Sequence, residues 1–459
     1  MSSKDGIYFL ISLITTVLLF YIIDASLYET ASIFLFIFFI LKFVGSIGFE
    51  YEVNLITILF GIFQLLIMPI VVYRLYNTKS NVIALFYNMS ITEDVYYSFM
   101  IPALLMMILG MLLPLYRNNT KTEVVKKAMI NCRKYLKGKS NIGIIMMIIG
   151  LSTGILEPFI SSEIRYIAYL LSKLLFVGIF YVIFSEIKQK KLYIIGGVAA
   201  LLIQTIIQGM FGELIYTSML AFILIIIGKP FKFYNKLILC LAGAFLVIVL
   251  QSIKREYRAA AWHGQQTENI SNSEYFASLL WKRITNPSEI FEEANFFPIV
   301  VRFNQGLIQS KVMDYIPNYN PYAEGTTIFN SVIASFIPRF LWPDKPIAGG
   351  KLNMEYFTGL IIEGYSMNVG PFGEAYGNFG STGGIIFMLF YGLFFNLAIF
   401  FLLKVSKSKP TIILWFPIIF LNAIQVETDI LMTVNSVIKN CLFVAICYWG
   451  ASRFMRIQL

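Results

Sequence analysis

Long apolar stretches alternate with short polar segments along most of the chain. Many of the apolar runs are long enough to cross a bilayer as a helix, which takes roughly 20 residues. Polar and apolar residues do not alternate within these runs, so we expect spanning helices and not the strands of a membrane barrel. The pattern predicts about twelve spans, with these approximate ranges: 7–23, 30–48, 53–73, 97–116, 142–157, 164–185, 192–211, 213–228, 236–252, 380–403, 410–427 and 430–450.

One long segment interrupts the pattern between the ninth and tenth predicted spans. Residues 253–379 carry nearly equal numbers of basic and acidic residues and many aromatic ones. Helix-start signals occur at Asn286–Pro287 and at Thr326–Thr327, and the second run stops at Pro338. We therefore expect an ordered cap of short helices that lies partly in the membrane interface.

Basic residues predict the orientation of the spans. Lys and Arg gather in the loops that follow the even-numbered spans, above all in segment 117–141, whereas the opposite short loops hold only Arg74 and Lys79. Because short cytoplasmic loops are enriched in Lys and Arg, both termini are expected in the cytoplasm and the cap outside it. Most of the net charge of +10 then reports topology, which excludes a nucleic-acid-binding function.

These observations predict an all-α polytopic membrane protein with one large extracytoplasmic loop. Residues 1–252 hold spans one to nine, 253–379 form the loop of short helices, and 380–459 hold spans ten to twelve. The composition agrees, because 58% of the residues are hydrophobic and 14% are charged, against about 25% charged in soluble proteins. The first apolar run lacks a small-residue cleavage pattern, so we interpret it as a span and not a signal peptide.

Few residues are available for metal or cofactor chemistry. The chain has one histidine, His263, and four cysteines without metal-site spacing, which argues against a zinc or transition-metal site. Oxygen-ligated Mg²⁺ or Ca²⁺ stays open. No glycine-rich nucleotide-binding motif occurs, so we predict no cofactor and no nucleotide.

The ninth predicted span ends in the run Q-S-I-K-R-E-Y-R, residues 251–258. If the helix continues beyond the span, Lys254 and Arg258 share one face at i, i+4 spacing, with Arg255 beside them. Like charges that close repel each other, and a diphosphate between them would relieve the repulsion. The alternative is interfacial anchoring by snorkelling side chains.

A second basic run, S-F-I-P-R-F-L-W-P-D-K-P, covers residues 335–346. Arg339 and Lys345 flank Trp342 in a chain stiffened by prolines, which present their neighbours with little entropy left to lose. Two cations and an aromatic ring suit a phosphosugar. The alternative is a proline-rich turn with an interfacial tryptophan.

Two further runs hold candidate polar residues. G-P-F-G-E-A-Y-G-N-F-G, residues 370–380, leads into the tenth span and carries Glu374 and Tyr376, which are expected to face the outer boundary of the membrane. Glu374 is a candidate general base or sugar-hydroxyl partner. The alternative is packing at a helix entry. Arg302, in the run R-F-N-Q-G, adds another cation to the same loop.

Several charged residues fall inside or near the ends of predicted spans, where they are costly and commonly functional. They are either interhelical ion pairs or the lining of a water-filled vestibule that reaches the site. These residues are Lys173, Glu213, Glu427, Asp429 and Lys439.

Four runs in their order along the chain, together with the layout of spans and loop, resemble the O-antigen and capsule repeat-unit polymerases (Wzy-type). These runs are K-R-E-Y-R, R-F-N-Q-G, P-R-F-L-W-P-D-K-P and G-E-A-Y-G-N-F-G. The match in motifs covers about 253–384. The resemblance implies a metal-independent glycosyltransferase of the GT-C type in the bacterial inner membrane. It would polymerise undecaprenyl-diphosphate-linked oligosaccharides on the outer face of that membrane. Its implied partners are the lipid-linked donor and acceptor, the bilayer, a chain-length regulator and a flippase, and no nucleic acid.

The resemblance also implies roles for residues of these runs. Arg258 and Arg339 resemble the diphosphate ligands, with Arg255 and Lys345 in support and Glu374 as a candidate base. The remaining candidate substrate contacts are Lys254, Tyr257, Arg302, Trp342 and Tyr376.

Three alternative functions stay open at this stage. A ligase would move the finished glycan onto another acceptor and would differ only in that acceptor. A lipid-linked oligosaccharide flippase or other transporter should show internal repeats and a charged central path, and no internal repeat is evident. A non-catalytic assembly protein would show no activity on lipid-linked substrate.

Overall fold

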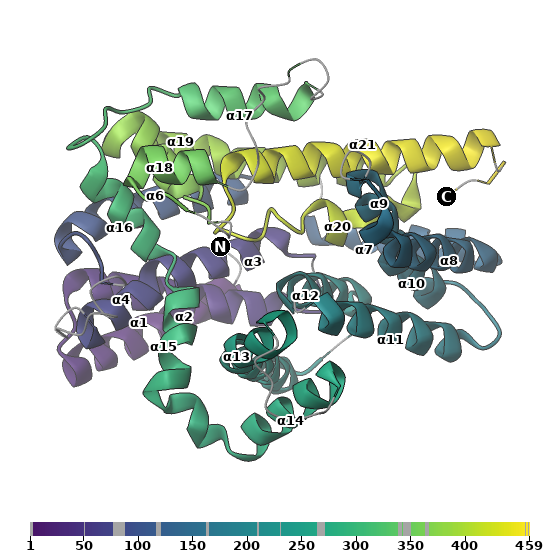
Figure 1. Ribbon diagram of the computed structural model, residues 1–459, viewed down its shortest axis with the longest axis horizontal. Coiled ribbons are helices and arrows are strands. Elements are labelled where there is room, and N and C mark those ends of the chain that lie inside the picture. Colours follow the sequence, from purple (N-terminus) through teal and green to yellow (C-terminus); the bar gives the residue numbers. More distant parts are fainter. Residues whose placement is uncertain are drawn as a thin grey trace.

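The computed structural model is built of helices, and no strand occurs in the part of the chain that it describes (Figure 1). That part comprises residues 3–49, 51–76, 88–115, 121–161, 165–208, 211–229, 231–263, 271–337, 342, 350–362, 367–454, 456–457 and 459.

Nine helical segments of the described chain are long and apolar enough to cross a membrane, so this is the fold of a helical membrane protein. They are α1 (Ser3–Ile23), α2 (Leu27–Ser46), α3–η1–α4 (Val53–Ile62, Phe63–Ile67, Met68–Leu75), α6 (Glu93–Leu112), α8–η2 (Ser140–Leu156, Glu157–Phe159), α9–α10 (Arg165–Ser172, Leu174–Phe184), α13 (Phe233–His263), α19 (Pro371–Val405) and α21 (Ile430–Phe454).

The other described helices are shorter or less apolar. They are α7 (Lys121–Leu136), α11 (Lys190–Gln208), α12 (Phe211–Ile226), α14 (Asn272–Thr285), η3 (Pro287–Phe291), α15 (Glu293–Phe303), α16 (Gly306–Tyr315), α17 (Thr326–Phe336), α18 (Lys351–Thr358), η4 (Pro410–Trp415) and α20 (Phe416–Ile419).

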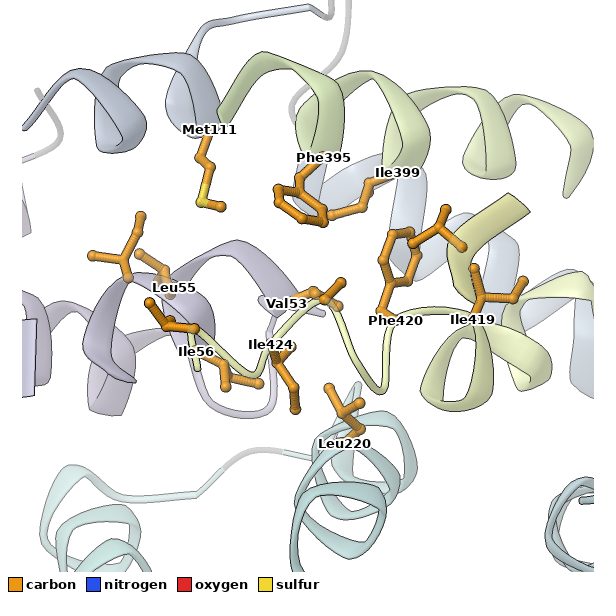
Figure 2. Close-up of a cluster of buried hydrophobic side chains, with 14 of the residues drawn as sticks. Val53, Leu55, Ile56, Met111, Leu220, Phe395, Ile399, Ile419, Phe420 and Ile424 are labelled. Carbon is orange, nitrogen blue, oxygen red and sulfur yellow. The ribbon is translucent and has the colours of Figure 1, made fainter. Parts of the chain in front are cut away.

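The span predicted over 410–427 differs from the structure. Two short helices, η4 and α20, occupy its first part, and turns follow up to α21. Irregular backbone is tolerated at membrane depth only where protein surrounds it. Phe420 and Ile424 lie among buried side chains of α3, α12 and α19 (Figure 2). Hydropathy could not separate this buried irregular segment from a helix that faces lipid.

The close pair formed by α6 and α19 anchors the helix that carries Glu374. Gly110 and Gly392 let the two backbones meet, because a Cβ at Gly392 would clash with the Met107 carbonyl. Small residues at such crossings are a common means of packing helices in membranes. The Asn396 amide adds hydrogen bonds to the carbonyls of Gly110, at 3.1 Å, and Leu113, at 2.8 Å.

The predicted loop does contain short helices, but its two ends are helical as well. α13 continues to His263, and α19 already begins at Pro371, after Gly370 with its φ of 81°. The helix predicted from Thr326–Thr327 is α17, which packs beside α21, while α15 runs crosswise to α2 and α21 (Figure 1).

One buried arginine ties the short helices to α13. The Arg283 guanidinium of α14 pairs with Glu289 of η3, lies 3.6 Å from the Glu256 carboxylate of α13 and donates to Asn295 of α15 at 3.0 Å. Because the arginine side chain is only 6% exposed, this network fixes α15 against α13. It thereby sets the distance between the cationic residues of those two helices.

Candidate functional site

Three cationic side chains from two helices gather in one place, and we call them the cation cluster. α13 continues past the predicted span, so Lys254 and Arg258 do share one helix face. Arg302, at the end of α15, comes close enough to interact electrostatically with both. The structure therefore brings together Lys254 and Arg302, which were predicted as substrate contacts, and Arg258, which was predicted as catalytic.

Glu427 joins the cation cluster from the turns before α21. Its carboxylate pairs with the Arg302 guanidinium, and it raises the pKa of that guanidinium above its ordinary value. The carboxylate is 11% exposed and the guanidinium 41%, so one face of the arginine stays accessible. The Gln64 amide donates to the other Glu427 oxygen at 3.0 Å.

Gln64 lies on a short π-helix, η1, inside the α3–η1–α4 segment. Single π-helical turns within longer helices are rare and frequently occur at functional sites. Here the extra residue in the turn places a polar amide inside an otherwise apolar span, 2% exposed, where it holds Glu427 and contacts Tyr216 of α12. The structure thus uses a local irregularity to position the carboxylate that orients Arg302.

The four groups of this arrangement carry more positive than negative charge. Three cations and one carboxylate sum to +2 when all four are ionised. Like charges held close together repel each other, and a bound anion with two negative charges reduces that repulsion. Two guanidiniums with an ammonium suit the spread oxygens of a diphosphate, because each planar fork can hold two oxygens.

A cavity of about 630 Å³ with polar and apolar lining residues lies where α17 and α18 meet the start of α21. Amides of Asn320, Asn330 and Asn353 and the acidic residues Glu355 and Asp429 line it. None of the lining residues that the structure describes is Lys, Arg or His, so the cavity and the cluster carry opposite charge.

The segment that ends the broken span connects the two features. Glu427 contacts the cation cluster and Asp429 lines the cavity, and two residues of extended chain span at most about 7 Å. Asp429 caps α21, since Met432 N–H donates to its Oδ1 at 2.5 Å. Glu374 of α19 lies beside Asp429 and accepts from Ile430 N–H at 2.9 Å. Both carboxyls are therefore held by the first turn of α21.

Other predicted residues are placed differently from the sequence-based expectation. Glu374 was expected to face the outer boundary of the membrane, but it is fully buried in the first turn of α19. Tyr257 is buried as well, stacks edge-on to Phe276 and donates from its hydroxyl to the Ile206 carbonyl at 2.6 Å. Arg255 is exposed.

The aromatic candidate Tyr376 packs against other aromatic rings. Tyr376 is half-buried, with its ring centroid 5.0 Å from that of Phe99 and 6.2 Å from that of Tyr322. Trp342 is half-buried. Arg339 and Lys345 lie outside the described residues.

The charges inside predicted spans are paired where the structure describes them. Lys173 and Glu213 form an interhelical ion pair between the α9–α10 segment and α12. The Lys439 ammonium lies 5.0 Å from the centre of the Tyr166 ring. The ion-pair interpretation is confirmed for Lys173 and Glu213, and Glu427 pairs with Arg302.

Comparison with known proteins gives a family and no activity. A family model described as a domain of unknown function (DUF8712) matches residues 119–400. The chain belongs to this family. No curated protein and no solved structure matches the chain. The DUF8712 region includes the cation cluster and the α17–α18 side of the cavity, whereas Glu427 and Asp429 follow it.

Sequence reasoning missed Gln64 and the asparagines of the cavity, but it did single out Glu427 and Asp429. Gln64 gave no signal beyond an isolated amide in an apolar run. Glu427 and Asp429 gave a stronger one, because two carboxylates at a span end are costly unless partnered. Asn330 and Asn353 of the cavity lie on short helices of ordinary composition, Asn320 lies between helices, and the three carry no recognisable spacing.

Proposed function

We propose that the protein is a membrane glycosyltransferase that joins undecaprenyl-diphosphate-linked oligosaccharide repeat units into a surface polysaccharide such as O-antigen or capsule. The observation that carries the proposal is that the Glu427–Asp429 segment joins a cationic cluster to a cavity with acidic lining residues. A cation cluster suits the diphosphate of a lipid-linked donor, and a cavity lined by asparagine amides, two acidic residues and apolar side chains suits uncharged, hydroxyl-rich sugars.

The chemistry needed is modest because the donor already carries a good leaving group. An acceptor hydroxyl oxygen bonds to the anomeric carbon while the bond from that carbon to the diphosphate oxygen breaks. The electron pair moves onto the diphosphate, and the hydroxyl proton leaves to a base. The cation cluster favours this step if it binds the leaving diphosphate more tightly as its charge grows.

The proposal includes a topology with about twelve spans, cytoplasmic termini and a site on the outer side of the bacterial inner membrane. Cysteines at exposed loop positions can test on which side of the membrane each loop lies. We expect a membrane-impermeant maleimide to label Asn318→Cys in intact cells and Lys188→Cys only after lysis, in a background without the four native cysteines. Labelling of Lys188→Cys from outside would reverse the orientation and contradict the proposed location of the site.

Activity is expected without divalent metal, since the cation cluster supplies the positive charge that a metal would otherwise provide. The test uses the protein in nanodiscs with lipid-diphosphate-linked repeat units extracted from a strain that lacks the gene. We expect chain growth on a gel, undiminished by EDTA. Loss of growth in EDTA with recovery in Mg²⁺ would contradict this mechanism.

The same assay separates the other functions. Transfer of a preformed glycan to a second lipid without chain growth would indicate a ligase. Movement of lipid-linked substrate across proteoliposomes, without new bonds, would indicate a flippase. No change in substrate under any condition, with correctly folded protein, would leave a non-catalytic assembly role and overturn the proposal.

A further inference from the structure

The cavity beside the cation cluster has rigid, preorganised walls. The Asn320 amide donates to the Tyr356 carbonyl at 2.8 Å, and the Tyr356 hydroxyl donates to the Pro321 carbonyl at 3.1 Å. The Thr327 hydroxyl is bonded to the Asn378 side chain of α19 at 2.7–3.0 Å. These contacts fix α18 to the chain that leads into α17, and α17 to α19, so the walls of the cavity are held in place before any ligand binds.

Charge and size limit what this cavity can hold. Its volume of about 630 Å³ falls among ordinary small-molecule sites, which run from about 300 to 1,000 Å³. The acidic residues Glu355 and Asp429 disfavour a phosphate or another anion. Amides of Asn330 and Asn353 offer both donors and acceptors, and Tyr315 adds an aromatic ring. This set matches a neutral or amino sugar with several hydroxyl groups.

The donor sugar and the acceptor sugar must occupy different positions relative to the cation cluster. The first sugar of the donor is bonded directly to the diphosphate, so it lies on the cluster side of the Glu427–Asp429 segment. A nucleophile that displaces the diphosphate approaches the anomeric carbon from the side away from it. The cavity has Asp429 in its wall, two residues along the chain from Glu427, which pairs with Arg302 of the cation cluster, so a sugar in it can lie next to a diphosphate-bound donor.

We propose that the cavity between α17, α18 and α21 is the acceptor-sugar subsite, in which Asp429 receives the proton of the attacking hydroxyl. This inference rests on the proposed function. The hydroxyl oxygen forms the bond to the donor's anomeric carbon, its proton passes to the Asp429 carboxylate, and the diphosphate leaves with the electron pair of the broken bond. Glu374, buried behind Asp429, is a positioning residue, because it holds the Ile430 N–H next to that aspartate.

The test separates binding from chemistry. The probe is a set of short fragments hydrolysed from the producing cell's own surface polysaccharide, without lipid or phosphate. We expect these fragments to bind the wild-type protein in nanodiscs by saturation-transfer NMR. We expect Asn330→Ala with Asn353→Ala to weaken binding at least tenfold and to raise the acceptor KM with little change in kcat. Asn318→Ala, an exposed amide outside the cavity, is the matched control and should behave as wild type.

Asp429→Asn should keep the fragments bound but lower kcat by about 10²–10⁴-fold, the range typical of losing a general base. The asparagine Oδ1 can still cap α21, so folding should be retained. Wild-type binding and acceptor KM in the double asparagine variant would overturn the subsite. Fragment binding that depends on the asparagines, in a protein with no transferase activity, would support the sugar site while rejecting the proposed function.

Discussion

Replacing Arg258 by alanine is expected to lower the rate of chain growth by about 10²–10³-fold, by analogy with removing one oxyanion-hole donor. The guanidinium belongs to the cation cluster with Lys254 and Arg302. Its contact with the diphosphate strengthens as the glycosidic bond breaks, so the loss should fall on kcat more than on KM. Arg258→Lys should recover part of the rate, because an ammonium keeps the charge but loses the two-oxygen fork.

The control for this result is Arg165→Ala. The Arg165 guanidinium is exposed and donates only to the nearby Ile160 carbonyl among the bonds of the described chain. The Arg165→Ala variant should grow chains as the wild type does. The measurements are initial rates with purified lipid-linked substrate and glycan length in a complemented deletion strain, both at matched protein level. Long chains from Arg258→Ala in both assays would show that this arginine only anchors α13 at the interface.

Local sequence signals predicted part of this site because they act within one helix. Lys254 and Arg258 share a face as soon as α13 continues, and the Thr326–Thr327 signal did open α17. Such features depend on spacing along a single element. The all-helical membrane fold followed from the length of the apolar runs in the same way.

Features that depend on contacts between distant segments could not be predicted. Residues 410–427 are apolar because protein surrounds them, and hydropathy gives the same signal for a lipid-facing helix. Pro410 and Pro417 were the available hints of a broken helix. Glu374 was placed at the membrane boundary because α19 was expected to begin near residue 380. The Gly370–Pro371 pair starts it earlier and turns this carboxyl inward.

The pair formed by Arg302 and Glu427 allows a structural role and a catalytic role to be separated. Arg302→Met leaves the Glu427 carboxylate, 11% exposed, without its cation. Breaking a fully buried ion pair costs about 3–5 kcal/mol. We expect a smaller loss here, since the guanidinium is 41% exposed. Chain growth should fall by at least 10²-fold, because a diphosphate ligand is lost as well.

A second change should restore folding without restoring function. In Arg302→Met with Glu427→Gln, the buried charge is gone and the glutamine oxygen can still accept from the Gln64 amide. Thermal unfolding should return close to the wild-type value, while chain growth stays low.

The Arg74–Glu29 pair is the matched control, with N–O distance 2.5 Å and exposures of 38% and 4%. Arg74→Met should destabilise the protein similarly. Adding Glu29→Gln should restore stability and leave growth normal, because glutamine still completes the capping box with Ser26. If the Arg302–Glu427 double variant also regained growth, Arg302 would serve only to hold Glu427, and the diphosphate would bind elsewhere. If Arg302 binds the diphosphate, the Arg302–Glu427 double variant should regain stability without chain growth. The Arg74–Glu29 double variant should have both.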